Sequence, residues 1–141
     1  MIVWAIASLV LITNKRIAVS VVSNLVLIAL LNNILKLIVR RARPTGFRLV
    51  AETGYSFPSG HSMVSMAFYG YLIYLIHKNV KNKKLRWTLM ACFSLLIFII
   101  GMSRIYLGVH YTSDVFAGFL FSLGYLVVYI YLTDPIVFQK K

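Results

Sequence analysis

The chain has 141 residues, of which 60% are hydrophobic, so it exceeds the roughly 45–50% apolar share of soluble domains. This excess excludes an ordinary water-soluble domain. The net charge of +12 would suit nucleic acid, but the basic residues lie between and at the ends of apolar stretches rather than along one face. We therefore expect a membrane surface or an anionic substrate as partner, and no nucleic acid.

Long apolar stretches dominate the chain, and each approaches the roughly 17–25 residues that cross a bilayer as a helix. The four stretches are about 17–39, 59–77, 87–107 and 113–133. They predict an all-α, polytopic transmembrane helix bundle that occupies residues 1–141 as a single domain. A fifth run, 1–12, is too short to span a hydrocarbon core of about 30 Å. We interpret it as the end of a helix whose start is missing, so we expect an N-terminally truncated chain.

Basic residues fall unequally on the two sides of the membrane that these stretches define. Nine lie on one side, namely Lys15, Arg16, Lys78, Lys81, Lys83, Lys84, Arg86, Lys140 and Lys141. Six lie on the other side, namely Lys36, Arg40, Arg41, Arg43, Arg48 and Arg104. The positive-inside rule makes the first side cytoplasmic. The smaller group then needs a reason to lie outside, and binding of a phosphate would be one.

The first segment with candidate functional side chains surrounds the end of stretch 17–39. We expect Pro44 to terminate this helix. Lys36, Arg40 and Arg43 stand at i, i+4 and i+7, so we expect them on one helical face. Three cations on one stripe favour a bound anion. The alternative for this segment is contact with lipid headgroups, as the only role of Arg40 and Arg41.

The second segment is Pro58-Ser59-Gly60-His61, at the expected start of the next helix. Proline suits the first turn and serine can cap it. The free N–H groups of a helix start, and a glycine that allows close approach, are suited to a phosphate. A lone histidine here is by itself more often an ordinary polar residue.

The third segment runs from Ser103-Arg104 to Asp114. His110 and Asp114 are four residues apart, so the carboxylate can accept a hydrogen bond from the imidazole and make it a better nucleophile. Arg104 approaches them only if the helix breaks near Gly108. The alternative is a structural His–Asp pair at the membrane interface.

Together the three segments resemble the PAP2 superfamily of phosphatases. The family signature is K-x6-RP, then PSGH, then SR-x5-H-x3-D, and this chain matches it without a substitution at Lys36, Arg43-Pro44, Pro58 to His61, Ser103-Arg104, His110 and Asp114. Membrane members typically have six helices. The resemblance places the four stretches as the third to sixth and implies that the first helices are absent.

The resemblance also implies a role for each matching residue. Lys36, Arg43 and Arg104 would hold the phosphate, with help from Ser59 and the backbone of Gly60. His110 would attack phosphorus to form a phosphohistidine, oriented by Asp114. His61 would protonate the leaving oxygen, and water would then hydrolyse the phosphoenzyme.

Acidic residues are scarce, since Glu52, Asp114 and Asp134 are the only three. A carboxylate cage for paired metal ions is hard to assemble from them, so we predict no metal and no cofactor. Glu52 lies beside the expected site. A solvated carboxylate is the simpler interpretation, and steering of substrate or closing of the loop is the alternative.

The leading hypothesis is therefore a metal-independent phosphatase in the cell membrane, with its active site on the extracytoplasmic side. Undecaprenyl diphosphate is the first candidate substrate, and phosphatidylglycerol phosphate or phosphatidate comes next. Two alternatives stay open: a phosphotransferase with a lipid or sugar acceptor, and a non-catalytic lipid-binding protein. The sequence leaves open whether the chain forms an oligomer.

Overall fold

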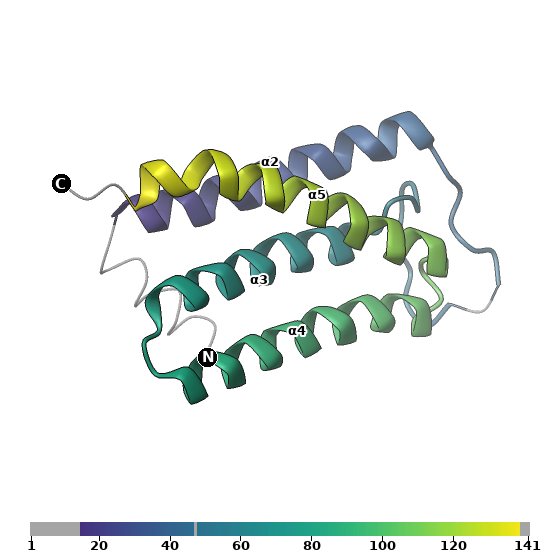
Figure 1. Cartoon of the computed structure of the whole chain (residues 1–141). Coiled ribbons are helices and arrows are strands. Elements are labelled where there is room, and N and C mark those ends of the chain that lie inside the picture. The colour runs from purple at the N-terminus through teal and green to yellow at the C-terminus, as the bar shows by residue number, and fades with distance from the viewer. Residues whose placement is uncertain (1–14, 47, 139–141) are drawn as a thin grey trace.

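The computed structural model describes residues 15–46 and 48–138, and these residues form helices without any strand. The helices are α2 (Lys15–Val39), α3 (Gly60–Asn79), α4 (Lys83–Tyr106) and α5 (Thr112–Val137). They lie alongside one another as a bundle (Figure 1). The predicted all-α bundle is confirmed. The expected helix end at 1–12 lies outside the described residues, and the single domain over 1–141 stays a prediction.

Helix α3 is the centre of the bundle, because its contacts with α2, α4 and α5 are the most extensive among the described helices. Among the described helices, those three are long and apolar enough to cross a membrane. The sequence predicted a fourth equally apolar span at 59–77, and α3 does not reach that apolarity. Its neighbours surround it, so it buries Ser62, Ser65 and Tyr71 against protein rather than presenting them to lipid.

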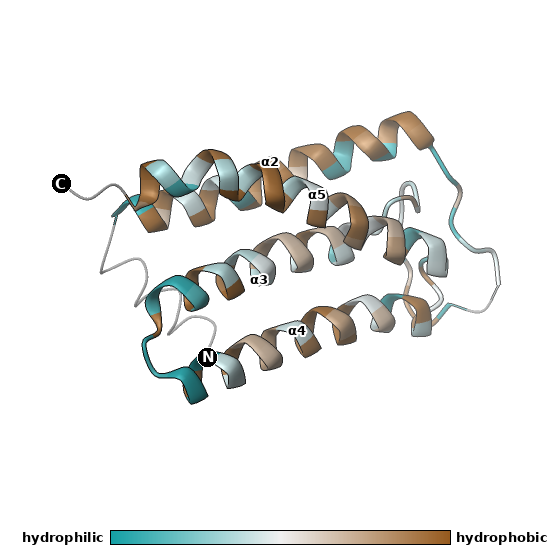
Figure 2. Cartoon of the chain, in the orientation of Figure 1, coloured by the Kyte–Doolittle hydropathy of each residue, from teal (hydrophilic) through white to brown (hydrophobic). Residues whose placement is uncertain are grey.

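The outer surface is strongly apolar, as a bundle in lipid requires. Leu120 is 70% exposed, Val19 67% and Val127 63%. Figure 2 shows hydrophobic colour along much of the helices and hydrophilic colour gathered at the α3–α4 connection. In water such a surface would aggregate, whereas lipid chains cover it at little cost.

Hydroxyl groups join α2, α3 and α5 inside the bundle. Tyr71 donates to Ser20 Oγ over 2.9 Å, and the hydroxyls of Ser23 and Tyr129 lie 2.6 Å apart. Asn24 donates to the backbone oxygen of Ala67 over 3.4 Å. Since lipid offers no partner, such interhelical bonds each contribute about 0.6–1 kcal/mol and fix which helices are neighbours.

The ends of the helices correct one expectation and bear out two. Helix α2 ends at Val39, well before Pro44. The next residue, Arg40, adopts a left-handed φ of 49°. Its N–H still bonds to Lys36 O over 3.0 Å, so Arg40 closes the helix as a C-terminal cap. Ser59 caps α3 as predicted. The break at Gly108 is also confirmed, with φ of 69°.

A close approach between α5 and the start of α3 fixes the end of the bundle that holds the long connection. A Cβ atom added to Gly118 would lie only 3.1 Å from Ser59 O and 3.1 Å from Ser62 Cβ. This close approach also brings the backbone of Ser59 to Asp114, and Ser59 N–H bonds to Asp114 O over 3.1 Å. Leu49 N–H bonds to Leu107 O over 3.1 Å, so the two connections at this end are joined as well.

Candidate active site

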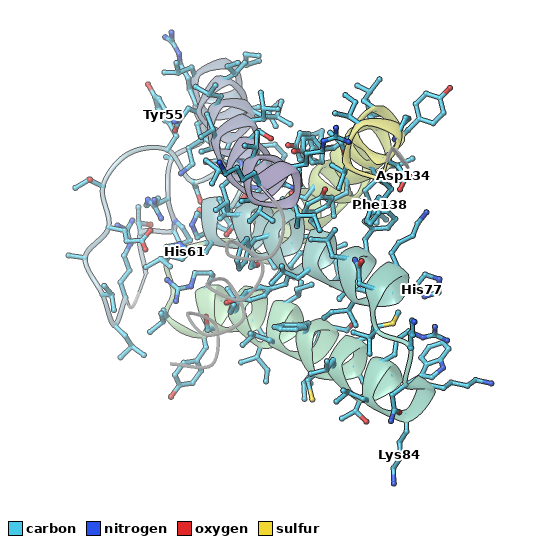
Figure 3. The ribbon with its side chains drawn as sticks, turned by 90° about the vertical axis from the view of Figure 1, so that its left-hand side faces the viewer. Tyr55, His61, His77, Lys84, Asp134 and Phe138 are labelled. Atoms are coloured by element: carbon cyan, nitrogen blue, oxygen red, sulfur yellow. The ribbon has the colours of Figure 1, made fainter. Side chains whose placement is uncertain are left out.

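The site end is the end of the bundle where residues 40–59, which connect α2 to α3, meet residues 107–111, which connect α4 to α5 (Figure 1). It contains a pocket of about 640 Å³. The residues that line it include Lys36, Arg43, Glu52, Gly60, His61 and His110. Figure 3 shows His61 beside the long connection, with His77 and Lys84 at the opposite end of the bundle. The three motif segments therefore meet around one cavity.

His110 presents one ring nitrogen to the cations that are predicted to bind phosphate. Its Nε2 lies 3.3 Å from Nη1 of Arg43. A guanidinium can only donate, so this contact assigns the lone pair to Nε2 and the proton to Nδ1. The residue lines the pocket while being only 3% exposed. The lone pair of this buried imidazole therefore lies beside a cation.

The other ring nitrogen faces Asp114, but not through the direct hydrogen bond that the sequence predicted. Nδ1 of His110 lies 3.6 Å from Oδ2 of Asp114, too far for a normal hydrogen bond. Ser56 joins the two, because its Oγ donates to Oδ2 of Asp114 over 2.5 Å and lies 3.4 Å from His110 Nδ1. The prediction was wrong on the direct bond because a residue distant in sequence shares the carboxylate.

Asp114 is fully buried, and further donors hold it. Tyr111 N–H bonds to Oδ2 over 2.9 Å. Arg41 Nη1 contacts Oδ1 over 2.8 Å. The expectation that Arg41 only meets lipid headgroups is wrong, since its side chain turns inward to the carboxylate. The exposed Arg40 instead bonds to Leu37 O, over 2.9 Å.

Lys36 and Arg43 reach the pocket from different elements. Lys36 is in the last turn of α2, whereas Arg43 follows the cap at Arg40 in a non-helical segment. The predicted single helical face is therefore wrong, because α2 ends before Arg43. Arg43 is held in place by backbone oxygens of Thr53 and Gly54, each 3.1 Å away.

Glu52 is the residue that sequence reasoning placed least well. Its Oε2 lies 2.7 Å from Arg43 Nη1 and 4.0 Å from His110 Nε2. Its Oε1 lies 3.8 Å from Arg104 Nη1. The expected solvated carboxylate is therefore wrong: the side chain is 23% exposed and lies among the predicted phosphate-binding cations. The sequence placed Glu52 beside the expected site, but it gave no sign that the carboxylate pairs with Arg43 and Arg104.

The start of α3 supplies the remaining predicted residues. Gly60 and His61 line the pocket. Ser59 is fully buried, and its hydroxyl accepts a bond from Ser62 Oγ over 3.0 Å. It caps the helix, and it is not among the described residues that line the pocket. The structure thus brings Lys36, Arg43, Gly60, His61, Arg104 and His110 together and sets Ser59 and Asp114 behind them.

The surroundings of His110 favour its neutral form. Burial, and then the Arg43 guanidinium, lower the pKa of the imidazole below its ordinary value, and the attraction of Asp114 only partly opposes this. A neutral imidazole carries the lone pair that nucleophilic attack needs. Because the ordinary pKa of histidine is about 6.5, His110 is thus mainly neutral at pH 7.

The grouping of possible metal ligands indicates whether the site suits a metal ion. Among the residues that the structure describes, no three His, Cys, Asp or Glu side chains are grouped as a metal site would need. The charges in and beside the pocket are mainly cationic, from Lys36 and Arg43 in its lining and from Arg104 next to Glu52. Such a site suits an anion directly.

The fold and site together define a membrane helix bundle with a cation-lined pocket around a buried histidine. The model of the PAP2 superfamily matches residues 17–137, and the chain belongs to this superfamily. A crystal structure of the first transmembrane PAP2 type phosphatidylglycerolphosphate phosphatase from Bacillus subtilis is similar, with a TM-score of 0.78 and 30% identity, over 87% of this chain and 62% of that one. The chain is an integral membrane protein.

Two curated relatives place it further. Phosphatidylglycerophosphatase B of Bacillus subtilis is 40% identical over 105 residues, which are 72% of this chain and 49% of the relative. Undecaprenyl-diphosphatase of Sulfolobus acidocaldarius is 30% identical, over 95% of this chain and 66% of the relative. The chain therefore spans between about half and two thirds of the length of these relatives.

Proposed function

We propose that this chain hydrolyses a lipid phosphate or diphosphate, with His110 as the nucleophile. The observation that carries the proposal is the position of His110 Nε2, which lies 3.3 Å from Arg43 Nη1 in a pocket that Lys36 and His61 also line. Cations around a lone pair would hold a phosphoryl group where that lone pair can attack it. The names of the two relatives, phosphatidylglycerophosphatase B and undecaprenyl-diphosphatase, describe enzymes that act on lipid phosphates.

In the proposed first step, Nε2 of His110 attacks phosphorus, and a P–N bond forms. The bond from phosphorus to the leaving oxygen breaks, and that oxygen takes the electron pair and a proton from protonated His61. The Nδ1–H of His110 stays directed toward Ser56 and Asp114, whose negative charge stabilises the cationic phosphohistidine.

In the second step, water attacks the phosphohistidine. His61, now neutral, takes a proton from this water, and the P–N electrons return to His110 as inorganic phosphate leaves. Lys36, Arg43 and Arg104 balance the charge of the transferring group in both steps. Neutralisation by fixed donors is usually the largest contribution in phosphoryl transfer, and one donor contributes roughly 10²–10³-fold.

Undecaprenyl diphosphate is our first candidate substrate, followed by phosphatidylglycerol phosphate and phosphatidate. The shared requirement is a phosphate or diphosphate head group on an apolar chain. The pocket supports such a substrate because Ala29 and Val64 of α2 and α3 extend its lining beside the cations. We place the site end on the extracytoplasmic side, since nine of the 15 basic residues belong to the opposite side.

The test is a phosphate-release assay of the purified protein on a panel of polyprenyl diphosphates and glycerophospholipid phosphates. His110→Ala is expected to lower the rate by about 10³-fold or more, because no other group replaces the nucleophile. Thermal unfolding in detergent checks that the variant is folded. Activity retained in His110→Ala would remove His110 as the nucleophile.

The same assay separates the alternatives. A chelator is expected to leave the parent activity unchanged, and chelator-sensitive release would overturn the metal-independent mechanism. With labelled lipid diphosphate, free phosphate supports hydrolysis, whereas label on an added lipid or sugar acceptor would indicate a phosphotransferase. Lipid binding without turnover on the whole panel would favour a non-catalytic role.

A further inference from the structure

Arg41 makes a set of contacts that the proposed mechanism does not use. Its Nη1 lies 2.8 Å from Oδ1 of Asp114 and 2.7 Å from Oγ of Ser113. Its guanidinium carbon lies 4.1 Å from the centre of the Tyr111 ring. An arginine on the membrane surface would leave its head group in water or among lipid phosphates. Arg41 instead joins the non-helical segment after α2 to the start of α5.

The backbone of Arg41 reaches the same carboxylate by a second route. Its carbonyl accepts a bond from Ser56 N–H over 2.8 Å. Ser56 in turn donates to Oδ2 of Asp114. One residue therefore governs donors to both oxygens of Asp114, Oδ1 through its guanidinium and Oδ2 through Ser56.

We propose that Arg41 is a positioning residue, which fixes the buried carboxylate of Asp114 against the Nδ1 side of His110. This inference rests on the proposed function of His110. Arg41 is two residues before Arg43 in the same non-helical segment. Arg43 contacts His110 at Nε2 over 3.3 Å. The two arginines therefore contact opposite ends of the His110–Asp114 pair.

The charge of Arg41 opposes the effect of Asp114 on His110. A carboxylate alone would favour the protonated imidazole, and a cation bound to that carboxylate reduces the attraction. The other charged or titratable groups around the pocket come from every packed element. They are Lys36 of α2, Arg43 and Glu52 of the connection, His61 of α3, Arg104 of α4 and Asp114 of α5.

Removing the charge of Arg41 has an effect of known sign. In Arg41→Gln, Asp114 keeps its charge with fewer donors, so the imidazolium form of His110 gains stability. The acid limb of the pH–rate profile is expected to move to higher pH by about one unit. The kcat is expected to fall about 10–100-fold through lost orientation, with KM within about twofold because Arg41 does not line the pocket.

The experiment compares the parent, Arg41→Gln, Arg41→Lys and Arg40→Gln over a range of pH. Arg41→Lys keeps the charge, so its acid limb is expected to stay at the parent position while part of kcat is recovered. Arg40→Gln is the matched control, because it removes a neighbouring exposed charge that bonds only to Leu37 O within the described residues. Its profile is expected to equal that of the parent.

A titration of the His110 ring by NMR in detergent tests Arg41 independently of turnover. The His110 signal is assigned by its loss in His110→Asn. A rise in the pKa of His110 in Arg41→Gln, but not in Arg41→Lys, supports the proposal. An unmoved pKa, or equal losses of kcat in both variants without a pH shift, overturns it. A parent without activity would overturn the proposed function, while the titration still decides the role of Arg41.

Discussion

The two ends of the bundle are both rich in charge, yet they differ in what surrounds that charge. At the end with the α3–α4 connection, Lys78 and Asp134 pair over 3.2 Å, with side chains 42% and 36% exposed. At the site end, Arg43 and Glu52 pair over 2.7 Å, with side chains 7% and 23% exposed. Each pair joins a cation to a carboxylate, but the two pairs differ in their degree of burial.

This difference separates a surface ion pair from a binding site. Exposed pairs contribute about 0–1 kcal/mol, because water screens them. A buried guanidinium such as Arg43 has given up its hydration and needs partners. It has Thr53, Gly54 and Val109 oxygens around it. Arg43 is thus fixed by buried backbone oxygens, whereas Lys78 pairs with Asp134 near water, beside the rings of Tyr74 and Phe138.

Among the variants that test the contrast between the two ends, Arg43→Lys is expected to have the largest effect on phosphate release. Lysine keeps the charge but loses the planar fork that contacts several backbone oxygens and His110 at once. The rate of phosphate release is expected to fall about 10²-fold. Arg48→Lys, at an exposed arginine of the same connection, is the matched control and is expected to retain parent activity. Equal activity in both variants would contradict a specific role for the Arg43 fork.

A smaller effect of opposite sign is expected for Glu52→Gln. The Glu52 carboxylate lies where it competes with a phosphate for Arg43 and Arg104. Without its charge, inorganic phosphate or vanadate is expected to inhibit about 10-fold more tightly, a change of about 1.4 kcal/mol. Inhibition constants measured beside those of Asp134→Asn provide the check. Unchanged or weaker inhibition in Glu52→Gln would show that the carboxylate does not compete.

The smallest effect is expected for Lys78→Ala, which removes the exposed pair at the opposite end. The free energy of unfolding is expected to change by less than about 1 kcal/mol. Phosphate release should match that of the parent. Thermal unfolding in detergent and the same phosphate assay measure both quantities. A loss of activity here would mean that the two ends are coupled.

The sequence predicts the architecture well where the signal is local. The apolar stretches place the four described helices, and Ser59 and Gly108 mark a cap and a break that the structure contains. The sequence predicts less well the features that depend on tertiary contacts. Pro44 suggested a later end of α2, because proline blocks a helix but does not require it to continue that far.

The candidate site shows the same division. Residues at fixed motif spacings, such as His61 and His110, meet around one pocket. Arg41, Glu52 and Ser56 act through contacts with residues far along the chain, and their own neighbours in sequence carry no sign of this. A periodic pattern describes a helix face. It cannot show how a connection of irregular backbone folds back over that face.

Gly118 affects whether the site can be transferred to another helix bundle. It allows α5 to approach Ser59 O within 3.1 Å of where a Cβ would lie, and that approach holds the second and third motif segments in register. The motif residues alone would therefore not transplant the chemistry to another bundle. In a chimaera that exchanges α5, a side chain one turn beyond Asp114 would press on Ser59 and Ser62, and these residues would have to give by a few tenths of an ångström.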